Sequence, residues 1–157
     1  MNFPTVPTLK FYKLKSDAIL PKKAHTGPFE DAAFDLFWTE PFDLILEPGE
    51  RTLTSTGLAC AIPDGYWVKF HERSGLANKN GIEVYAGVID PGYMGEWKVI
   101  LHNSGKTTLK LTPGTAIAQF SVEEIIPVEI EEIDSLVFEV EKNKRTRQEK
   151  GFGSSTK

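Results

Sequence analysis

Residues 73–77 carry side-chain types that could bind a phosphate. They read Arg-Ser-Gly-Leu-Ala and follow a stretch of alternating apolar residues. The guanidinium of Arg73, the hydroxyl of Ser74 and the backbone N–H that Gly75 leaves accessible can together cradle an anion. Taken alone, the same residues are also explained as an ordinary capped turn.

A candidate general base lies in residues 86–96, where Asp90 is followed by Pro91 and Gly92. Asp, Pro and Gly in this order suit a tight turn, so Asp90 could be a turn former only. The glycines of this segment also let a ligand approach the backbone, and Asp90 and Tyr93 would then stand at the tip of a hairpin. These residues alone leave both interpretations open.

Two more segments add groups that could contact a ligand. Gln119 lies in a strand-like stretch after a Pro-Gly turn, where such a side chain most often faces solvent. Phe152 stands between two glycines, after a charged segment at residues 139–150 that has the composition of a frayed tail. A lone apolar side chain on a flexible backbone is typical of a segment that folds onto another surface.

The sequence indicates no metal centre built from histidine or cysteine. His25, His71 and His102 are far apart and have no second ligand at i+4, so we expect ordinary surface or turn histidines. Cys60 is the only cysteine, which excludes an internal disulfide and a cysteine-rich zinc site. The apolar neighbours of Cys60 predict a small buried side chain.

The composition excludes several classes of protein. The 157 residues include 18 basic and 22 acidic side chains, and the formal net charge of −4 argues against coating nucleic acid or an anionic membrane. No apolar run approaches the roughly 20 residues of a membrane span, and the first residues lack the form of a signal peptide. We therefore expect one soluble cytoplasmic domain, with neither nucleic acid nor membrane as a partner.

The elements that must position these residues are short strands. Apolar residues alternate at period two in residues 66–71, 97–102 and 136–141, and Pro-Gly and Asn-Gly turn pairs separate such stretches. Residues 74–81 are too polar for a strand and predict about one helical turn that ends at Gly81. Many short strands with spaced turns predict an all-β sandwich, jelly roll or barrel.

Five stretches resemble, in order and spacing, the five motifs of the trimeric deoxyuridine triphosphatase (dUTPase) family. They are residues 31–36, 73–77, 86–96, 117–119 and 147–155. Each motif is short, but five of them in order make the resemblance specific. It implies a β jelly roll over residues 1–140, a flexible C-terminal arm over residues 141–157 that carries the fifth motif, and a homotrimer with shared active sites.

The activity that this resemblance implies is Mg²⁺-dependent hydrolysis of dUTP. Water would attack the α-phosphorus, and the products would be dUMP and pyrophosphate. Such an enzyme keeps uracil out of DNA and supplies dUMP for thymidylate synthesis. Because Mg²⁺ prefers its own waters and phosphate oxygens, no dedicated protein cage for the metal is expected.

The third motif, by the same resemblance, holds the nucleoside and the water. Asp90 would be the general base that deprotonates the attacking water. Tyr93 would pack on the deoxyribose and leave no room for a 2′-hydroxyl. The backbone from residue 87 onward would pair with uracil. The remaining residues of this segment that would contact the substrate are Gly87, Val88, Ile89 and Lys98.

The other motifs would supply the phosphate site. The residues that would bind phosphate are Arg73, Ser74, Gly75, Gln119 and Ser154, and Gly153 would contact the substrate. Arg147 would reach the γ-phosphate, and Phe152 would close over the uracil. Asp35 would lie near the waters of Mg²⁺ or support the phosphate-binding arginine.

Two other functions stay open from the sequence. The related dCTP deaminase branch shares the jelly roll but would use a glutamate-based site that acts on the base, and the hairpin with Asp90 and Tyr93 disfavours it. A non-catalytic β-sandwich module that keeps the nucleotide pocket is the second alternative. The intact set of candidate site residues disfavours it.

Overall fold

Antiparallel β-sheets make up most of the first of two compact units, Met1–Ile126 and Pro127–Lys157. A computed structural model describes residues 6–27 and 29–147 of the chain. One sheet has the order β1–β4–β8–β6, with bounds Lys10–Lys13, Arg51–Ala61, Glu96–Asn103 and Ile82–Tyr85. Another has the order β2–β10–β5–β7, with bounds Phe34–Phe37, Ala116–Glu124, Tyr66–His71 and Val88–Ile89. Strands β3 and β9 pair with each other, with bounds Leu44–Leu46 and Leu109–Leu111.

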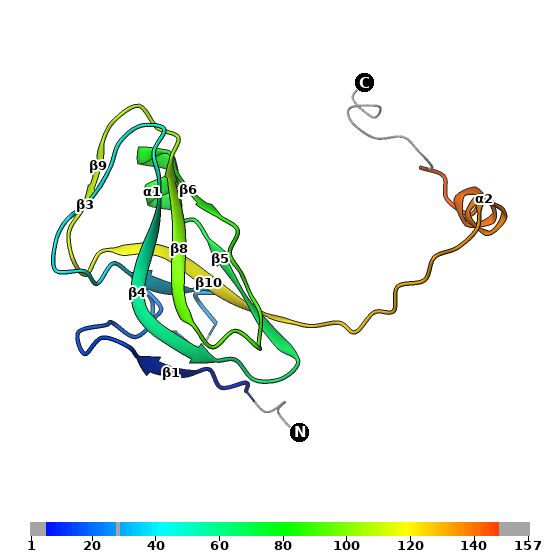
Figure 1. Ribbon diagram of the computed structural model, residues 1–157, viewed down its shortest axis with the longest axis horizontal. Coiled ribbons are helices and arrows are strands. Elements are labelled where there is room, and N and C mark those ends of the chain that lie inside the picture. Colours follow the sequence, from blue (N-terminus) through cyan, green and yellow to red (C-terminus); the bar gives the residue numbers. More distant parts are fainter. Residues whose placement is uncertain (1–5, 28, 148–157) are drawn as a thin grey trace. The chain divides into compact units, whose positions relative to one another are not determined.

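The core of the first unit lies between the two larger sheets. Trp97 on β8 is fully buried, and its ring centre lies 5.5 Å from that of Phe70 and 5.3 Å from that of Phe120, both on the other sheet. Phe11 on β1 packs edge-on against the same ring at 5.0 Å. Such edge-to-face pairs add about 0.5–1.5 kcal/mol beyond the burial of their area. The mostly β, antiparallel architecture agrees with the alternation of the sequence, and Figure 1 shows β4 and β8 side by side as long strands.

Helix α1 (Ser74–Asn80) connects β5 to β6 and confirms the short helix expected there. Arg73 precedes it in an extended conformation, and Gly81 ends it with a φ of 69°. The N–H of Gly81 donates to the carbonyl of Ala77 at 2.9 Å. Because this left-handed conformation favours glycine, the helix stops where the sequence predicts.

Cys60 on β4 is buried, as its apolar neighbours predicted. Burial raises the pKa of its thiol to about 11. The thiol therefore stays protonated at neutral pH and behaves as a small apolar side chain.

The second unit corrects one expectation from the sequence. The alternation in residues 136–141 predicted a strand, but helix α2 (Ser135–Asn143) is found there. Asp134 caps this helix, because its side chain accepts a hydrogen bond from a backbone N–H of the first turn at 2.9 Å. Glu139 and Lys142 add an ion pair at i,i+3 spacing. The capping residue and the charge spacing favour a helix over a strand that would have no partner in this unit's described part.

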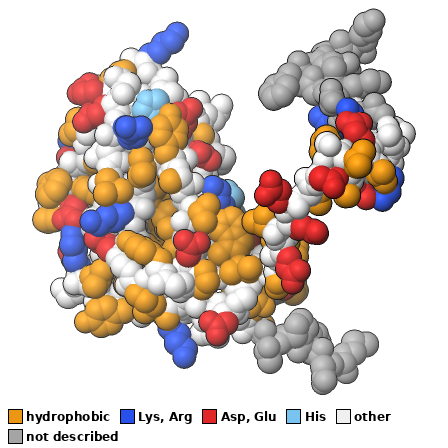
Figure 2. Space-filling model, turned by 45° about the vertical axis from the view of Figure 1, so that its right-hand side comes forward, with side chains coloured by type: hydrophobic (Ala, Val, Ile, Leu, Met, Phe, Trp, Pro, Cys, Tyr) orange, Lys and Arg blue, Asp and Glu red, His pale blue; other side chains and the backbone are white. Residues whose placement is uncertain are grey.

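Apolar side chains of the second unit are exposed. Val128 and Ile130 precede α2, and Leu136 and Phe138 lie on it, all with more than half of their surface accessible. Figure 2 shows apolar and acidic side chains interleaved along this unit. In the described part of the chain, no helix combines the length and the apolar content that crossing a bilayer requires.

Replacing Trp97 by alanine should lower the free energy of unfolding by about 3–5 kcal/mol, because the ring joins both sheets. Urea unfolding at a fixed chain concentration, followed by circular dichroism, measures this loss. Ile45→Ala is the matched control, since Ile45 on β3 is 47% exposed and should cost less than about 1 kcal/mol. Equal losses in the two variants would contradict the central place of Trp97 in the core.

Candidate active site

A row of polar side chains crosses the outward face of the second sheet. Gln119 on β10 pairs in register with Asp35 on β2 and with His71 on β5. Side chains of directly paired residues stand on the same face of an antiparallel sheet. The next pairs along the same strands join Phe34, Phe120 and Phe70. These rings point into the core, so alternation along three strands brings the polar row together at the surface.

Asp35 fixes the guanidinium of Arg73 by two hydrogen bonds. Nε donates to Oδ1 at 3.0 Å, and Nη2 donates to Oδ2 at 3.2 Å. Arg73 precedes α1, so the pair places the guanidinium beside the exposed first helical residues, Ser74 and Gly75. A ligand can approach the backbone of Gly75, because the space that a Cβ would take there is open. Of the two roles expected for Asp35, contact with the waters of Mg²⁺ or support of the arginine, this geometry is compatible with the support of Arg73.

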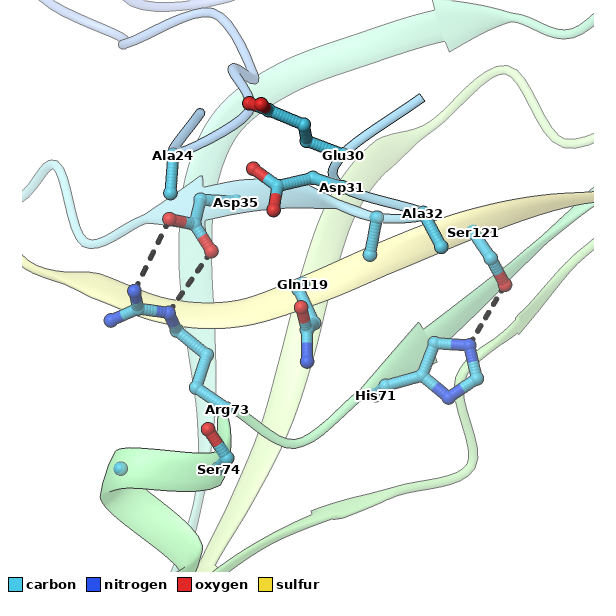
Figure 3. A pocket seen from close by; sticks show the side chains of 12 residues that line it. Ala24, Glu30, Asp31, Ala32, Asp35, His71, Arg73, Ser74, Gln119 and Ser121 are labelled. Atoms are coloured by element: carbon cyan, nitrogen blue, oxygen red, sulfur yellow. Dashed lines mark hydrogen bonds and ion pairs between the residues drawn. The ribbon is translucent and has the colours of Figure 1, made fainter. Parts of the chain in front are cut away.

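A cavity of about 640 Å³ lies over this row of polar side chains (Figure 3). Because the candidate phosphate-binding residues line it, we call it the phosphate cavity. Its lining includes the expected residues Asp35, Arg73, Ser74, Gly75 and Gln119. The Nε2 of Gln119 donates to the backbone carbonyl of Glu72 at 2.7 Å, which orients the amide. The first, second and fourth sequence motifs thus meet in one cavity.

Four other polar or charged residues line this cavity and were not among the expected site residues. They are Glu30, Asp31, His71 and Ser121. The backbone N–H and the Nδ1 of His25 lie 2.7 and 2.9 Å from the two carboxylate oxygens of Asp31. These hydrogen bonds lower the pKa of the Asp31 carboxyl. Period-two alternation along β5 puts His71 on the outward face with Lys69, but it does not show which strand lies beside it.

The residues of the third motif line a second cavity of about 300 Å³, which we call the hairpin cavity. The expected site residues in its lining are Gly87, Val88, Ile89, Asp90, Tyr93 and Lys98. Leu53, Tyr85 and Ile100 give the same cavity an apolar part. Strands β6 and β8 pair as a hairpin, and the long segment that connects them, which includes β7, places a carboxylate beside an apolar surface.

The hairpin backbone is fixed against β5 at its start. The N–H of Phe70 donates to the carbonyl of Gly87 at 2.8 Å, and the Nζ of Lys69 donates to the carbonyl of Ala86 at 2.9 Å. Ala86 and Gly87 have φ angles of 60° and 86°. A Cβ on Gly87 would lie 3.1 Å from the carbonyl oxygen of Phe70, so this approach of two backbones requires glycine.

Tyr93 and Asp90 form the tip of the hairpin. The N–H of Tyr93 donates to the carbonyl of Asp90 at 3.0 Å. The phenol of Tyr93 donates to the carbonyl of Glu96 at 2.9 Å, which holds the ring across the hairpin. The carboxylate of Asp90 is left exposed beside this ring.

Glu96 connects the returning strand β8 to β4. Its carboxylate accepts hydrogen bonds from the hydroxyl of Ser55 and from the N–H of Gly57. Burial raises the pKa of Glu96, but these hydrogen bonds and the nearby lysines outweigh it, so the pKa is lowered overall. The ionised carboxylate lies 3.6 Å from the Nζ of Lys98 and positions that ammonium at the cavity.

One chain does not bring all the expected residues into one cavity. Asp90 lines the hairpin cavity, whereas Arg73 and Gln119 line the phosphate cavity. Arg147 belongs to the second compact unit. The expected residues that lie outside the described part of the chain are Phe152, Gly153 and Ser154. Each of these two cavities therefore holds one part of the chemistry that the sequence predicts.

Proteins of similar sequence carry one name. The dUTPase family model matches residues 19–156 of this chain. A deoxyuridine 5′-triphosphate nucleotidohydrolase of Clostridium tetani is 41% identical over 152 residues, which cover 96% of this chain and 97% of the relative. The protein of the same name from Gloeothece citriformis is 42% identical over 149 residues and covers 94% and 95% of the two chains.

Solved structures share the fold. The dUTPase of Staphylococcus bacteriophage 80alpha, solved with dUPNHPP, matches with a TM-score of 0.81 at 26% identity and covers 94% of this chain and 98% of that chain. A dUTPase mutant from phage phi11 of S. aureus matches with a TM-score of 0.72 at 24% identity, over 82% of this chain and 97% of that one. The family match over most of the chain, the identity to curated relatives and the shared fold lead to one conclusion: this chain belongs to the dUTPase family.

Proposed function

We propose that this chain hydrolyses dUTP to dUMP and pyrophosphate, as a dUTP diphosphatase. The observation that carries the proposal is its pair of complementary cavities. One holds Arg73 and Gln119, which suit phosphates, and the other holds Asp90 and Tyr93, which suit a nucleoside and a water. The relatives at 41% and 42% identity are both deoxyuridine 5′-triphosphate nucleotidohydrolases.

The active enzyme is a homotrimer in this proposal, in which the hairpin cavity of one chain completes the phosphate cavity of its neighbour. Support comes from the division of the site residues between two cavities in a single chain. The hairpin cavity also has exposed apolar residues, with Leu53 58%, Val88 56% and Tyr85 38% accessible. Apolar side chains spread over the visible face of the first unit (Figure 2). A second copy that covers such side chains would gain about 25 cal/mol per Å² of buried apolar area.

The phosphate cavity would bind the triphosphate through oriented donors. Asp35 holds the guanidinium of Arg73 in one plane, which leaves other N–H groups of Arg73 for phosphate oxygens. The hydroxyl of Ser74, the backbone of Gly75 and the amide of Gln119 line the same cavity. The phosphates would therefore meet several donors whose positions are set before binding.

Mg²⁺ fits this cavity as an ion held mainly by phosphates and water. Among residues 6–27 and 29–147, no three His, Cys, Asp or Glu side chains are grouped to hold a metal. Carboxylates of Glu30, Asp31 and Asp35 line the cavity, and an ion that keeps several waters needs few direct ligands. Asp35 would hold the ion through water. When bound, Mg²⁺ neutralises part of the phosphate charge.

Asp90 is the proposed acceptor of the proton from the attacking water. Its backbone carbonyl is engaged by Tyr93, and its carboxylate is exposed at the hairpin tip. As the water oxygen bonds to the α-phosphorus, its proton passes to Asp90. The bond from the α-phosphorus to the bridging oxygen breaks, and pyrophosphate leaves. General-base help of this kind contributes about 10²–10⁴ in rate.

The nucleoside would lie along the hairpin. The left-handed Ala86 and Gly87 turn the backbone at the cavity, so that Gly87, Val88 and Ile89 can pair with the edge of uracil. The ring of Tyr93, held through its phenol, would pack on the deoxyribose. Lys98, positioned by Glu96, would complete the contacts of this half of the site.

The last residues would close the site. We place a jelly-roll domain over residues 1–140 and an arm over residues 141–157, in which Arg147 would reach the γ-phosphate. Phe152 would cover the uracil, and its place between glycines after a charged segment supports a role on another surface. Next to it, Gly153 would contact the substrate and Ser154 would bind phosphate.

The wild-type chain should release pyrophosphate from dUTP, and Asp90→Asn should lower kcat at least about 100-fold, because an amide cannot accept the proton of the water. Binding of a non-hydrolysed dUTP analogue should stay near normal in the variant. Coupled pyrophosphate release measures both proteins, with dCTP as the parallel substrate. Turnover of dCTP alone would contradict the proposed function, and near-normal turnover by Asp90→Asn would contradict only the role of Asp90.

Tyr93→Ala should raise activity on UTP relative to dUTP, because removal of the ring makes room for a 2′-hydroxyl. Turnover of dUTP should fall in the same variant. The ratio of kcat/KM values for the two nucleotides measures the effect. Tyr93→Phe is the control, because it keeps the ring and should keep the ratio on the side of dUTP; an unchanged ratio in Tyr93→Ala would place sugar selection elsewhere.

A mixture of two inactive variants tests the shared site. Asp90→Asn and Arg73→Ala are unfolded together and refolded as a 1:1 mixture. If Asp90 and Arg73 of one site come from different chains, random mixing gives three-quarters hybrid trimers with one complete site each, so roughly a quarter of wild-type activity should return.

The control mixture pairs Arg73→Ala with Gln119→Ala. These residues line one cavity of one chain, so no hybrid site is complete and activity should stay absent. If verified hybrids of the first mixture also stayed inactive, Asp90 and Arg73 would belong to one chain's own site.

A further inference from the structure

The phosphate cavity contains a histidine that the proposed mechanism does not use. His71 pairs directly with Gln119, and the Cβ atoms of such a pair lie about 4.5–5.5 Å apart. It also lies two residues before Arg73 and lines the same cavity (Figure 3). An anion bound between Arg73 and Gln119 therefore comes within reach of the His71 ring.

Hydrogen bonds fix which nitrogen of His71 carries the hydrogen. The hydroxyl of Ser121 donates to the carboxylate of Glu123 at 2.7 Å, so its oxygen can only accept from the ring. The Nε2 of His71 lies 2.8 Å from that oxygen and must be the donor. Within the described residues, Nδ1 takes part in no hydrogen bond. In the neutral ring, Nδ1 therefore presents a lone pair.

A phosphate oxygen cannot bind this lone pair, because both are acceptors. It can bind Nδ1 only after Nδ1 is protonated, and the hydrogen bond is then charge-assisted. We propose that His71 is a further phosphate-binding residue of this cavity, which takes up one proton when a nucleoside triphosphate binds. This inference rests on the proposed function.

More acidic than basic groups surround this part of the polar row. The acidic groups that face it from β10, the loop before β2 and β2 itself are Glu123, Glu30, Asp31 and Asp35. The basic groups on its own side are Arg73 and Lys69, of which the first is paired with Asp35. Strand β7, the other neighbour of β5, has no ionisable residue. Because Nδ1 must gain a proton before it can donate to a phosphate oxygen, the affinity for a triphosphate should fall as pH rises.

Calorimetry of the full chain with dUpNHpp, the imido analogue of dUTP, counts the protons. Titrations at pH 7 in buffers of different ionisation enthalpy give the number taken up per site. The wild-type chain should take up more protons than His71→Gln, whose amide can still donate to Ser121. The Kd of His71→Gln for dUpNHpp should be roughly tenfold higher than that of the wild-type chain at pH 6, and the two Kd values should be about equal at pH 8.

Two further variants separate the ring from its surroundings. His25→Gln is the matched control, because His25 is next to the same cavity but is engaged by Asp31, and it should keep the wild-type proton uptake. Ser121→Ala frees Nε2, so the neutral ring can place its hydrogen on Nδ1. This variant should still bind dUpNHpp but should lose the extra proton uptake. Long-range ¹H–¹⁵N spectra of the three histidines report the same change at His71 directly.

The outcomes separate this inference from the proposed function. If the wild-type chain hydrolyses dUTP but takes up no more protons than His71→Gln, His71 does not bind phosphate and the function stands. A pH-independent ratio of the two Kd values would overturn the inference in the same way. If the wild-type chain neither binds dUpNHpp nor hydrolyses dUTP, the proposed function fails and the inference falls with it.

Discussion

The pairing register of β10 with its two neighbours decides what the second sheet can do. Phe120 stacks on Phe34 at 5.4 Å and packs against Trp97 at 5.3 Å, so the aromatic core holds β10 in one register. A slip of one residue would turn the polar row inward and the rings outward. The polar face for which we propose phosphate binding is therefore a consequence of how the opposite face packs. Substitutions in the core would then disturb this face without changing any residue of the cavity.

A chain with a net charge of −4 does not attract a triphosphate through its overall charge, so the orientation of the cations that line its cavities matters. Asp35 holds Arg73 at 3.0 Å, and Glu96 lies 3.6 Å from Lys98, so each of these cations is oriented by a carboxylate. Such pairs add little net positive charge and supply direction instead. Recognition of the phosphates then depends on the geometry of the donors and on a divalent cation more than on overall attraction.

The sequence predicted what depends on local geometry. The turn at Asp90, the helix that stops at Gly81 and the burial of Cys60 all follow from residues within a few positions of each other. Helix α2 departs from the sequence prediction because the alternating apolar residues around Phe138 are typical of a strand, whereas the cap at Asp134 favours a helix. Alternation gave no sign of which strands pair, so the place of His71 beside Gln119 could not be foreseen. Asp90 and Arg73 line different cavities because of how distant strands are arranged, and the sequence pattern could not predict this either.

The reactivity of the single cysteine, which is buried, can report how often the first sheet opens. Cys60 lies in β4, which pairs with both β1 and β8, and its thiol is protonated at neutral pH. An alkylating reagent can reach it only when these strands separate from the core, and each molecule can react once. The rate of alkylation in native buffer therefore reports how often this sheet opens. Added nucleotide that slows the reaction would measure, without any introduced label, how far ligand binding suppresses such fluctuations.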